Sequence, residues 1–550
     1  MRARRPGVNL KIILRLTRVL INCVIKAVNN DVCLNFDPHH RCESRSRAFP
    51  RGRAARGRLK QAESTFYMRN YLIKNISIVN EGKISTADLL LKNGRIEKIG
   101  SALRPSFAVT EINGEGLHLL PGVIDDQVHF REPGLTHKAT IYTEAKAAVA
   151  GGVTSFMEMP NTLPPAFTQE LLEEKYAIGA RSSLANYSFY MGTSNDNADE
   201  ALLTNKKKKD ICGIKIFMGS STGNLLVDNY LTLDRLFREC EVLIATHCED
   251  EKIIRQNLER LKSQGRELVA SDHPLIRDEH ACFESSLTAI QFAQKHGSRL
   301  HVFHLSTEKE MALFGNMLPL AEKRITAEVC VHHLHFTSDD YSRLGNQIKC
   351  NPAIKAPYNR DALWTALLDD RLDLIATDHA PHTLAEKGYM RDVGGRLRLL
   401  QEGLLPEGPL SAGADARPGG HGSGGSAYER AHAGLPLVQH SLRLMLHYVR
   451  EGKISLEKLV EKMSHAVAVC FNIAERGFIR EGYFADLVIV DLGQSSRVES
   501  GNILYKCGWS PLEGFEFPAT ITHTFVNGHL VYGNGAFDES QWGQRLRFDR

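Results

Sequence analysis

The sequence predicts an α/β protein: a (β/α)8 barrel of the TIM type with a small accessory β-domain built from both chain ends. Eight short apolar segments alternate with helical stretches within residues 121–479, as parallel strands buried on both faces do. Short alternating strands with Asn and Gly turns occupy residues 68–120 and 480–535. A length of 550 residues suits such a barrel with an added domain.

Residues 1–67 differ from the rest of the chain in charge. They contain 15 Lys and Arg against 4 Asp and Glu, which leaves 53 against 60 in residues 68–550. We expect this basic extension to be disordered, a targeting segment, or a translated leader upstream of a start at Met68. The mildly acidic body does not indicate a nucleic-acid-binding surface. No apolar run in the sequence is long enough to span a bilayer.

The elements follow in a regular order. The accessory domain is expected to begin with YLIKNISIVN, ADLLLKN and GRIEKIG, and to resume with ADLVIVDL and THTFVNGHLVYGNG. The eight barrel strands are expected in GVIDDQVHF, GVTSFMEMP, NYSFYMG, GIKIFMG, EVLIATHCED, LHVFHLS, ITAEVCVHH and LDLIATDHAPH. TEAKAAVAGG and SSLTAIQFAQKHG fit crossover helices that end at glycine.

Residues 388–430 interrupt this pattern after the eighth strand. They carry 11 of the 44 glycines of the chain and include PGGHGSGGS. Such a segment buries too little apolar surface to pack, so we predict a mobile surface insertion. The 11 cysteines are scattered without a CxxC pair, which favours reduced thiols in a cytoplasmic enzyme over a disulfide framework.

Polar side chains gather at the ends of the predicted strands, where a barrel enzyme carries its chemistry. They are His129, Lys215, His247, His304 and Asp378. Singly, each has an ordinary explanation, such as a hydrogen-bonded histidine or a helix N-cap. Together, imidazoles and a carboxylate at one barrel mouth predict a site for Zn²⁺ or a similar ion.

Two further residues bear on this metal site. A charged, unpaired Lys215 would be costly among the apolar residues of GIKIFMG. As a carbamate formed with CO2 it would instead be an anion able to bridge two metal ions; the alternative is an ion-paired lysine. Gln127 shares a strand face with His129 by alternation, and its amide oxygen is expected to be a weak or absent metal ligand.

Eight segments carry a specific resemblance. PGVIDDQVHFREPG, MPNT, GIKIFMG, ATHCED, HPLIRDEHAC, HVFHLS, NPAIK and TDHAPH follow the order of amidohydrolase superfamily motifs. Over residues 68–387 and 432–535 the chain resembles the long-chain dihydroorotases. The resemblance implies one or two Zn²⁺ ions on His129, carbamylated Lys215, His247, His304 and Asp378. It implies substrate contacts from Arg131, Asn161, Asn351, His382, Ala433 and Gly434.

The reaction that the resemblance implies is reversible cyclisation of N-carbamoyl-L-aspartate to dihydroorotate in pyrimidine biosynthesis. It would use a metal-activated hydroxide, with Asp378 as general base and acid. A guanidinium can grip a carboxylate bidentately, which suits Arg131. The family also implies a homodimer, with aspartate transcarbamoylase as a candidate partner.

Three positions depart from the family pattern. Gln127 stands where the first histidine of an HxH pair is usual, so one metal position is expected to be under-coordinated, differently occupied or empty. NPAIK stands where an NPPLR-like run is common, so Lys355 takes the place of an arginine. This exchanges a planar, forked guanidinium for a compact ammonium group. AHAG at residues 431–434 replaces an APSG-like loop, which puts backbone contacts from Ala433 and Gly434 in question.

Other histidines and two other functions complete the predictions. We expect hydrogen-bonded scaffold roles for His332, His333 and His335. His273 and Arg277 are expected to orient a helix start and its ion pairs. One alternative function is that of a hydantoinase or allantoinase, whose substrates do not require Arg131 and Asn161 to bind a carboxylate. The other is an inactive dihydroorotase-like scaffold subunit, which would not require the complete set of metal ligands.

Overall fold

The computed structural model describes residues 69–219, 225–392, 394–400 and 426–550. The predictions for residues 1–67 and for the glycine-rich centre of the insertion lie outside these residues.

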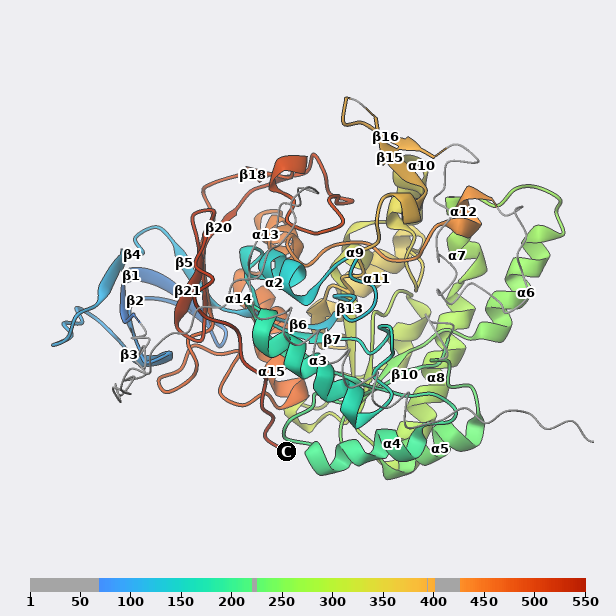
Figure 1. Cartoon of the computed structure of the whole chain (residues 1–550), viewed down its shortest axis with the longest axis horizontal. Helices are drawn as coiled ribbons and strands as arrows, with labels where there is room; N and C mark the ends of the chain where they lie inside the picture. The colour runs from blue at the N-terminus through green and yellow to red at the C-terminus, as the bar shows by residue number, and fades with distance from the viewer. Residues whose placement is uncertain (1–68, 220–224, 393, 401–425) are drawn as a thin grey trace, which may run out of the picture. The chain divides into compact units, whose positions relative to one another are not determined.

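A nine-stranded sheet joins the two ends of the described chain (Figure 1). Its N-terminal strands are β1 (Tyr71–Asn80), β2 (Lys83–Lys92), β3 (Arg95–Gly100), β4 (Thr110–Asn113) and β5 (His118–Pro121). Its C-terminal strands are β17 (Leu487–Asp491), β20 (Thr520–Val526), β21 (His529–Gly533) and β22 (Ala536–Phe537). The two sets meet where β5 pairs antiparallel with β17. The accessory β-domain built from both chain ends is confirmed.

Parallel strands form the barrel. They are β6 (Val123–Val128), β7 (Val153–Glu158), β8 (Asn186–Phe189), β9 (Met191–Gly192), β10 (Ile214–Phe217), β11 (Ile244–His247), β12 (Leu300–Val302), β13 (Ile325–Cys330) and β14 (Leu374–Ala376). Only Tyr190 separates β8 from β9, so these two short strands occupy one barrel position. The barrel closes where Val128 bridges to His379 in parallel. Eight strand positions therefore match the predicted barrel.

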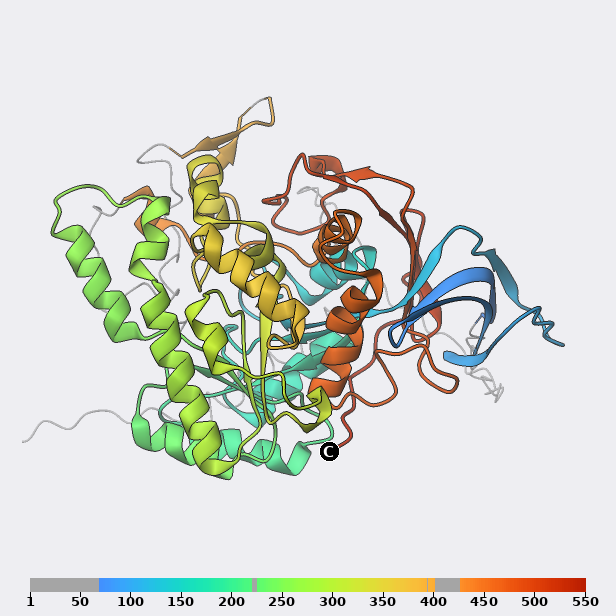
Figure 2. The same cartoon turned by 180° about the vertical axis from the view of Figure 1, so that it is seen from behind.

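Helices cover the outside of these strands, as the view from behind shows for α8 and α11 (Figure 2). The longer ones are α2 (Ile141–Ala150), α3 (Gln169–Ser182), α5 (Tyr230–Glu239), α6 (Glu251–Lys262), α8 (Glu279–His296), α11 (Pro357–Leu368) and α13 (Ser441–Arg450). The shorter ones are α4 (Ala198–Leu202), α7 (His273–Ile276), α9 (Val331–His335), α10 (Tyr341–Leu344), α12 (Ala427–Arg430), α14 (Leu456–Val460) and α15 (Ala466–Phe471). Both predicted crossover helices exist, and α8 ends at Gly297 in the left-handed conformation, which glycine adopts at little cost.

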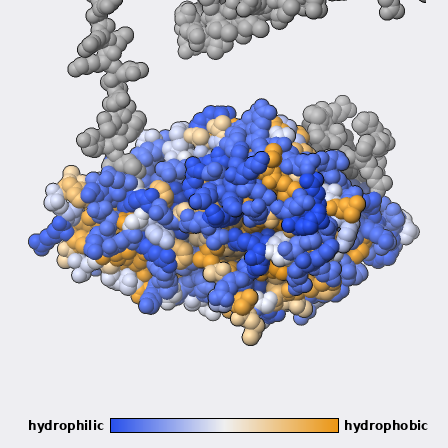
Figure 3. All heavy atoms as spheres, turned by 90° about the horizontal axis from the view of Figure 1, so that it is seen from below, coloured by the Kyte–Doolittle hydropathy of each residue, from blue (hydrophilic) through white to orange (hydrophobic). Residues whose placement is uncertain are grey.

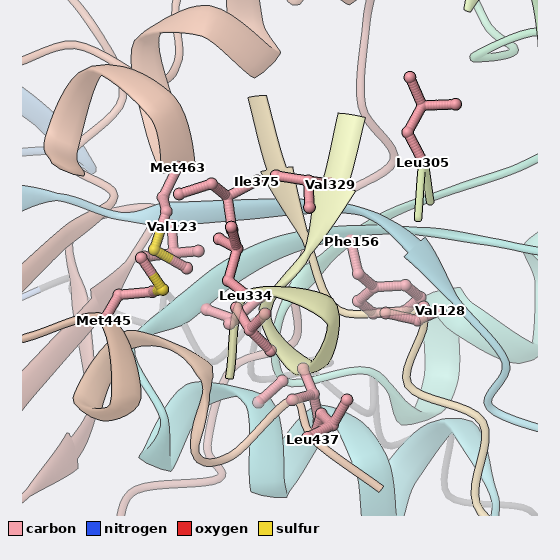
Figure 4. Packing of buried hydrophobic residues seen from close by; sticks show 14 of the residues in the cluster. Val123, Val128, Phe156, Leu305, Val329, Leu334, Ile375, Leu437, Met445 and Met463 are labelled. Carbon is pink, nitrogen blue, oxygen red and sulfur yellow. The ribbon is translucent and has the colours of Figure 1, made fainter. Parts of the chain in front are cut away.

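The core lies between strands and helices. Figure 4 shows Val329 of β13 and Ile375 of β14 packed near Met463, with Val128 and Phe156 in contact from β6 and β7. These branched and aromatic side chains are buried, as the near-continuous apolar strand segments predict.

The structure differs from the predicted insertion at its flanks. Strands β15 (Tyr389–Arg391) and β16 (Leu397–Leu399) form an antiparallel hairpin, and α12 follows the undescribed centre. Tyr389 and Tyr428 are buried anchors that composition alone could not reveal. The prediction that the whole of residues 388–430 cannot pack is therefore wrong for these flanks.

The face seen in Figure 3 is mostly hydrophilic, with hydrophobic side chains scattered among polar ones. Within the described residues, every helix is too short or too polar to cross a membrane.

Candidate active site

The predicted ligands lie together at the C-terminal mouth of the barrel. His129 follows β6, Lys215 lies in β10, His247 ends β11, and His304 and Asp378 each come two residues after a strand. All five side chains are buried. His304 and Asp378 have positive φ angles of 41° and 47°, a strained conformation for non-glycine residues. Such strain is concentrated at functional sites, where the surrounding structure holds it in place.

His129 is oriented from both sides. Its Nδ1 lies 2.8 Å from Asn161 Oδ1, and its Nε2 lies 3.1 Å from Asp378 Oδ1. Both partner oxygens can only accept, so a neutral ring can donate to only one of them; when Nδ1 donates to Asn161, Nε2 keeps a lone pair that a metal ion could use. Burial lowers the pKa of His129 and keeps the ring neutral. Asn161 thus contacts His129 through its amide oxygen, and its predicted contact with substrate stays a prediction.

His247 and His304 form a second pair of facing nitrogens. His247 Nδ1 lies 2.9 Å from His304 Nε2. On its far side His247 Nε2 lies 3.0 Å from Glu249 Oε2, and Arg277 pairs with the same carboxylate. Burial would raise the pKa of Glu249, yet the Arg277 guanidinium holds it at about 2. The charged Glu249 therefore orients the His247 ring.

Lys215 is fully buried, and its Nζ has no hydrogen-bond partner among the described residues. It lies over the Phe303 ring, 3.9 Å from the ring centroid. Burial lowers the pKa of Lys215 to about 7, although the Glu328 carboxylate opposes this shift. Near neutral pH a large fraction of this side chain is therefore a neutral amine.

Gln127 points across the barrel toward β13. Its Oε1 accepts a long contact of 3.6 Å from the Cys330 thiol. Nearby, neither ring nitrogen of His332 makes a hydrogen bond of normal geometry within the described part of the chain. The Thr377 backbone contacts this ring and opposes the lowering of its pKa by burial, so the predicted scaffold role of His332 stays a prediction. This role holds for His335, whose Nδ1 lies 2.9 Å from the Tyr448 hydroxyl.

Arg131, His382 and Lys138 form a buried cationic group beside the metal ligands. Arg131 Nη2 lies 3.1 Å from His382 Nε2, and Lys138 Nζ lies 3.0 Å from His382 Nδ1. Lys138 also pairs with Glu386 at 2.9 Å. Burial lowers the pKa of Lys138 to about 8 and that of His382 well below its ordinary value. The described residues place no carboxylate within 4.0 Å of Arg131.

The segment after the insertion returns to this cationic group. Ala433 O lies 3.0 Å from His382 Nε2, and Gly434 N donates to Lys349 O at 2.8 Å. Lys387 Nζ donates to the carbonyls of Lys349, His432 and Gly434. Ala433 and Gly434 therefore border the site although the AHAG loop lacks the expected proline.

Asn351 lies at the edge of the same mouth. Its Oδ1 is 3.1 Å from His273 Nε2, and His273 Nδ1 is 2.7 Å from the Tyr428 hydroxyl. His273 begins α7, as predicted, and it also links Asn351 to Tyr428 in the C-terminal flank of the insertion.

The donor set fits a divalent metal centre. Two imidazole nitrogens face each other, a third imidazole faces a carboxylate oxygen, and an unpartnered buried lysine completes the group. Nitrogen and oxygen donors at such short separations are the arrangement that Zn²⁺ and similar ions require. Partners such as Asn161 and Glu249, which fix the rings from behind, are typical of metal-binding histidines.

Sequence reasoning did not find three of these residues. Glu249 follows His247 by two positions in ATHCED, and an acid so close to a ligand histidine was an available signal. Lys138 contacts His382 and Glu386 only through the fold, and no spacing in the sequence indicates this. Glu386 lies four residues after His382, a spacing that was an available signal.

Comparisons with known proteins agree with this geometry. The amidohydrolase family model matches residues 118–531. The chain belongs to the amidohydrolase family. It is 31% identical to a dihydroorotase of Methanosarcina acetivorans, over 84% of this chain and 91% of that protein. It is 28% identical to an allantoinase of Deinococcus radiodurans, over 86% of this chain and 98% of that protein.

A solved structure confirms the fold. The L-hydantoinase from Arthrobacter aurescens superimposes with a TM-score of 0.75 at 24% identity, over 87% of this chain and all of that chain. Within the family the protein is a cyclic amide hydrolase of the dihydroorotase and allantoinase group.

Proposed function

We propose that the protein is a metal-dependent dihydroorotase that interconverts dihydroorotate and N-carbamoyl-L-aspartate. The supporting observation is the cationic group of Arg131, His382 and Lys138. A neutral imidazole has one lone pair, yet His382 faces a cationic donor on each of its two nitrogens. In either tautomer of His382, one ring nitrogen carries a proton. That N–H group then faces the N–H donor of Arg131 or Lys138, so one close contact between two donors remains.

An anionic substrate group would relieve this surplus of donors. Glu386 is the carboxylate of this group, and Lys138 and His137 already share it. A carboxylate could accept from the Arg131 fork bidentately. Dihydroorotate carries such a carboxylate, whereas the rings of allantoin and hydantoin do not. The charge balance therefore favours dihydroorotate.

The chemistry can be assigned to named residues. His129, His247, His304 and Asp378, with Lys215 as a carbamate, would hold the metal. A bound divalent ion supplies a Lewis acid for the ring carbonyl and lowers the pKa of water. Asp378 takes the proton of the attacking water and delivers it to the leaving ring nitrogen. The neutral amine fraction of Lys215 is the form that adds to CO2.

The test is an assay of the purified full-length protein with measured metal content. Dihydroorotate, allantoin and hydantoin are each supplied in turn. We expect the highest kcat/KM with dihydroorotate and at least one metal ion per chain. A higher kcat/KM with allantoin or hydantoin would refute the substrate assignment. Background rates on all three, without bound metal, would indicate an inactive scaffold.

Two assembly proposals rest on the resemblance alone. We propose a homodimer, which light scattering of the purified protein would measure directly. Co-purification with aspartate transcarbamoylase would test the second partner.

A further inference from the structure

A second group of metal-binding side chains lies at the C-terminal end of β13, outside the ligand set described above. Cys330, His332 and His333 are buried, and one potential ligand atom of each lies within 4.8 Å of the others. The two imidazole rings are 4.1 Å apart between centroids. The proposed reaction uses none of these three residues.

The hydrogen bonds leave ring nitrogens ready to bind a cation. His333 Nε2 lies 3.2 Å from the carbonyl of Pro352, which can only accept, so Nε2 carries the proton. His333 Nδ1 then presents a lone pair, and it has no partner within the described residues. A ligand histidine commonly donates its other N–H to a backbone carbonyl in this way. At His332 neither ring nitrogen makes a hydrogen bond of normal geometry within the described residues, although the Thr377 backbone lies near the ring.

Gln127 supplies a fourth donor. Its amide oxygen is 3.6 Å from Cys330 Sγ. Cys330 pairs in register with Ala376 of β14, two residues before Asp378. The group therefore lies beside the active site, between the ends of β6 and β13. Leaving several buried polar atoms unpaired destabilises the folded state, and a bound cation would remove this cost.

The donor types specify the ligand. One thiol, two imidazoles and an amide oxygen suit Zn²⁺ or Co²⁺ and do not suit Mg²⁺ or Ca²⁺, which prefer oxygen. Four protein ligands would fill a tetrahedral site and leave no open position, which is typical of structural metal sites. A coordinating thiol loses its proton when the metal binds.

We propose that Cys330, His332, His333 and Gln127 form a separate structural site for Zn²⁺ or a similar ion. Gln127 would therefore bind the ion of this second site. The lack of a histidine at position 127 would then not prevent a metal ion from binding at His129 and Asp378. The ion would fasten the end of β13 to the end of β6, on which His129 and Arg131 depend.

The experiment is a Co²⁺ titration of the chelator-stripped full-length protein, followed by absorption without substrate. A cysteine thiolate bound to Co²⁺ gives a near-ultraviolet charge-transfer band, which nitrogen and oxygen ligands do not produce. We expect this band in the wild type and its loss in Cys330→Ser. The matched control is Cys282→Ser, because Cys282 is an equally buried thiol on α8, near Ser306. This variant should keep the band.

A second variant covers the case in which Cys330→Ser fails to fold. His332→Gln should keep the band but weaken Co²⁺ binding by roughly tenfold or more. Absence of the band in the wild type would overturn the proposal, as would its persistence in a folded Cys330→Ser protein. The result does not depend on the substrate, so it stands apart from the dihydroorotase assignment.

Discussion

The buried ion pair of Glu158 and Lys175 supports the strand end that carries His129 and Arg131. Both side chains are 1% exposed. Glu158 Oε1 accepts a hydrogen bond from Phe130 N at 3.1 Å, and Lys175 Nζ donates to Met159 O at 2.8 Å. Lys175→Met keeps the bulk of the side chain and removes its charge. We therefore expect the variant to leave the Glu158 carboxylate buried without a cationic partner, directly behind the active site.

The magnitude follows from this geometry. Removing one partner of a buried pair costs about 3–5 kcal/mol, because the remaining charge is uncompensated. Replacing both partners by neutral groups costs less. We therefore expect the free energy of unfolding to fall by about 3–5 kcal/mol in Lys175→Met, and by clearly less in the double variant with Glu158→Gln.

The loss should also depend on pH. Burial raises the pKa of Glu158, and Lys175 is the strongest group opposing it. Without Lys175 the folded-state pKa rises further above the unfolded value of about 4.3. The folded state then binds more protons, so stability falls as pH rises between these two pKa values. Lys175→Met should thus be destabilised more at pH 8 than at pH 5.

Urea denaturation of the wild type, both single variants and the double variant measures these differences. The kcat/KM of folded Lys175→Met should also fall, since Phe130 lies between His129 and Arg131. The reasoning is refuted if Lys175→Met loses less than about 1 kcal/mol, or if the double variant is less stable than Lys175→Met at neutral pH.

Three further predictions concern the site and its border. Asn161→Ala frees His129 Nδ1 and should weaken metal binding about 10–100-fold, measured by competition with a chelator. Lys215→Ala should lose activity and recover part of it with added short-chain carboxylates, whereas the carbamate assignment fails if no carboxylate restores turnover. Gly434 has a φ of 135°, and a Cβ added there would lie 2.6 Å from the backbone oxygen of Ala380. A Cβ added at Gly482 would meet no atom of the described residues within 4 Å. Gly434→Ala should therefore lower the melting temperature more than Gly482→Ala.

The barrel and the accessory sheet could be predicted because their signals are local. Segments such as GIKIFMG and EVLIATHCED are apolar and β-branched along their length, which is typical of strands buried on both faces. The alternating strands at both ends meet because β5 pairs with β17. The positions of His129, His247 and Asp378 at strand ends then follow from the barrel itself.

The partners of these residues could not be predicted. Gln127 was expected to be a weak or absent ligand on the strand face of His129, and its amide oxygen contacts Cys330. The pairing of β6 with β7 is irregular between Asp125 and Val128. Strand alternation assumes a regular strand and cannot detect such a shift.

Contacts between residues far apart in the sequence could not be predicted from local patterns either. Lys138 reaches His382 across 244 positions of the chain, and composition gives no sign of this contact. The prediction that residues 388–430 do not pack was wrong for the flanks, because it used the glycine content of the whole segment. That content does not reveal single buried residues such as Tyr428.

We infer that Arg131, His382 and Lys138 recognise a substrate carboxylate. The most direct measurement compares dihydroorotate with dihydrouracil, which is the same ring without the carboxylate, in the wild type and in Arg131→Met. A charge-assisted hydrogen bond contributes about 1.5–3 kcal/mol, so kcat/KM for dihydroorotate should fall roughly 10–150-fold in the variant. The kcat/KM for dihydrouracil should change little. Equal losses on both rings, or a wild type that prefers dihydrouracil, would contradict the account.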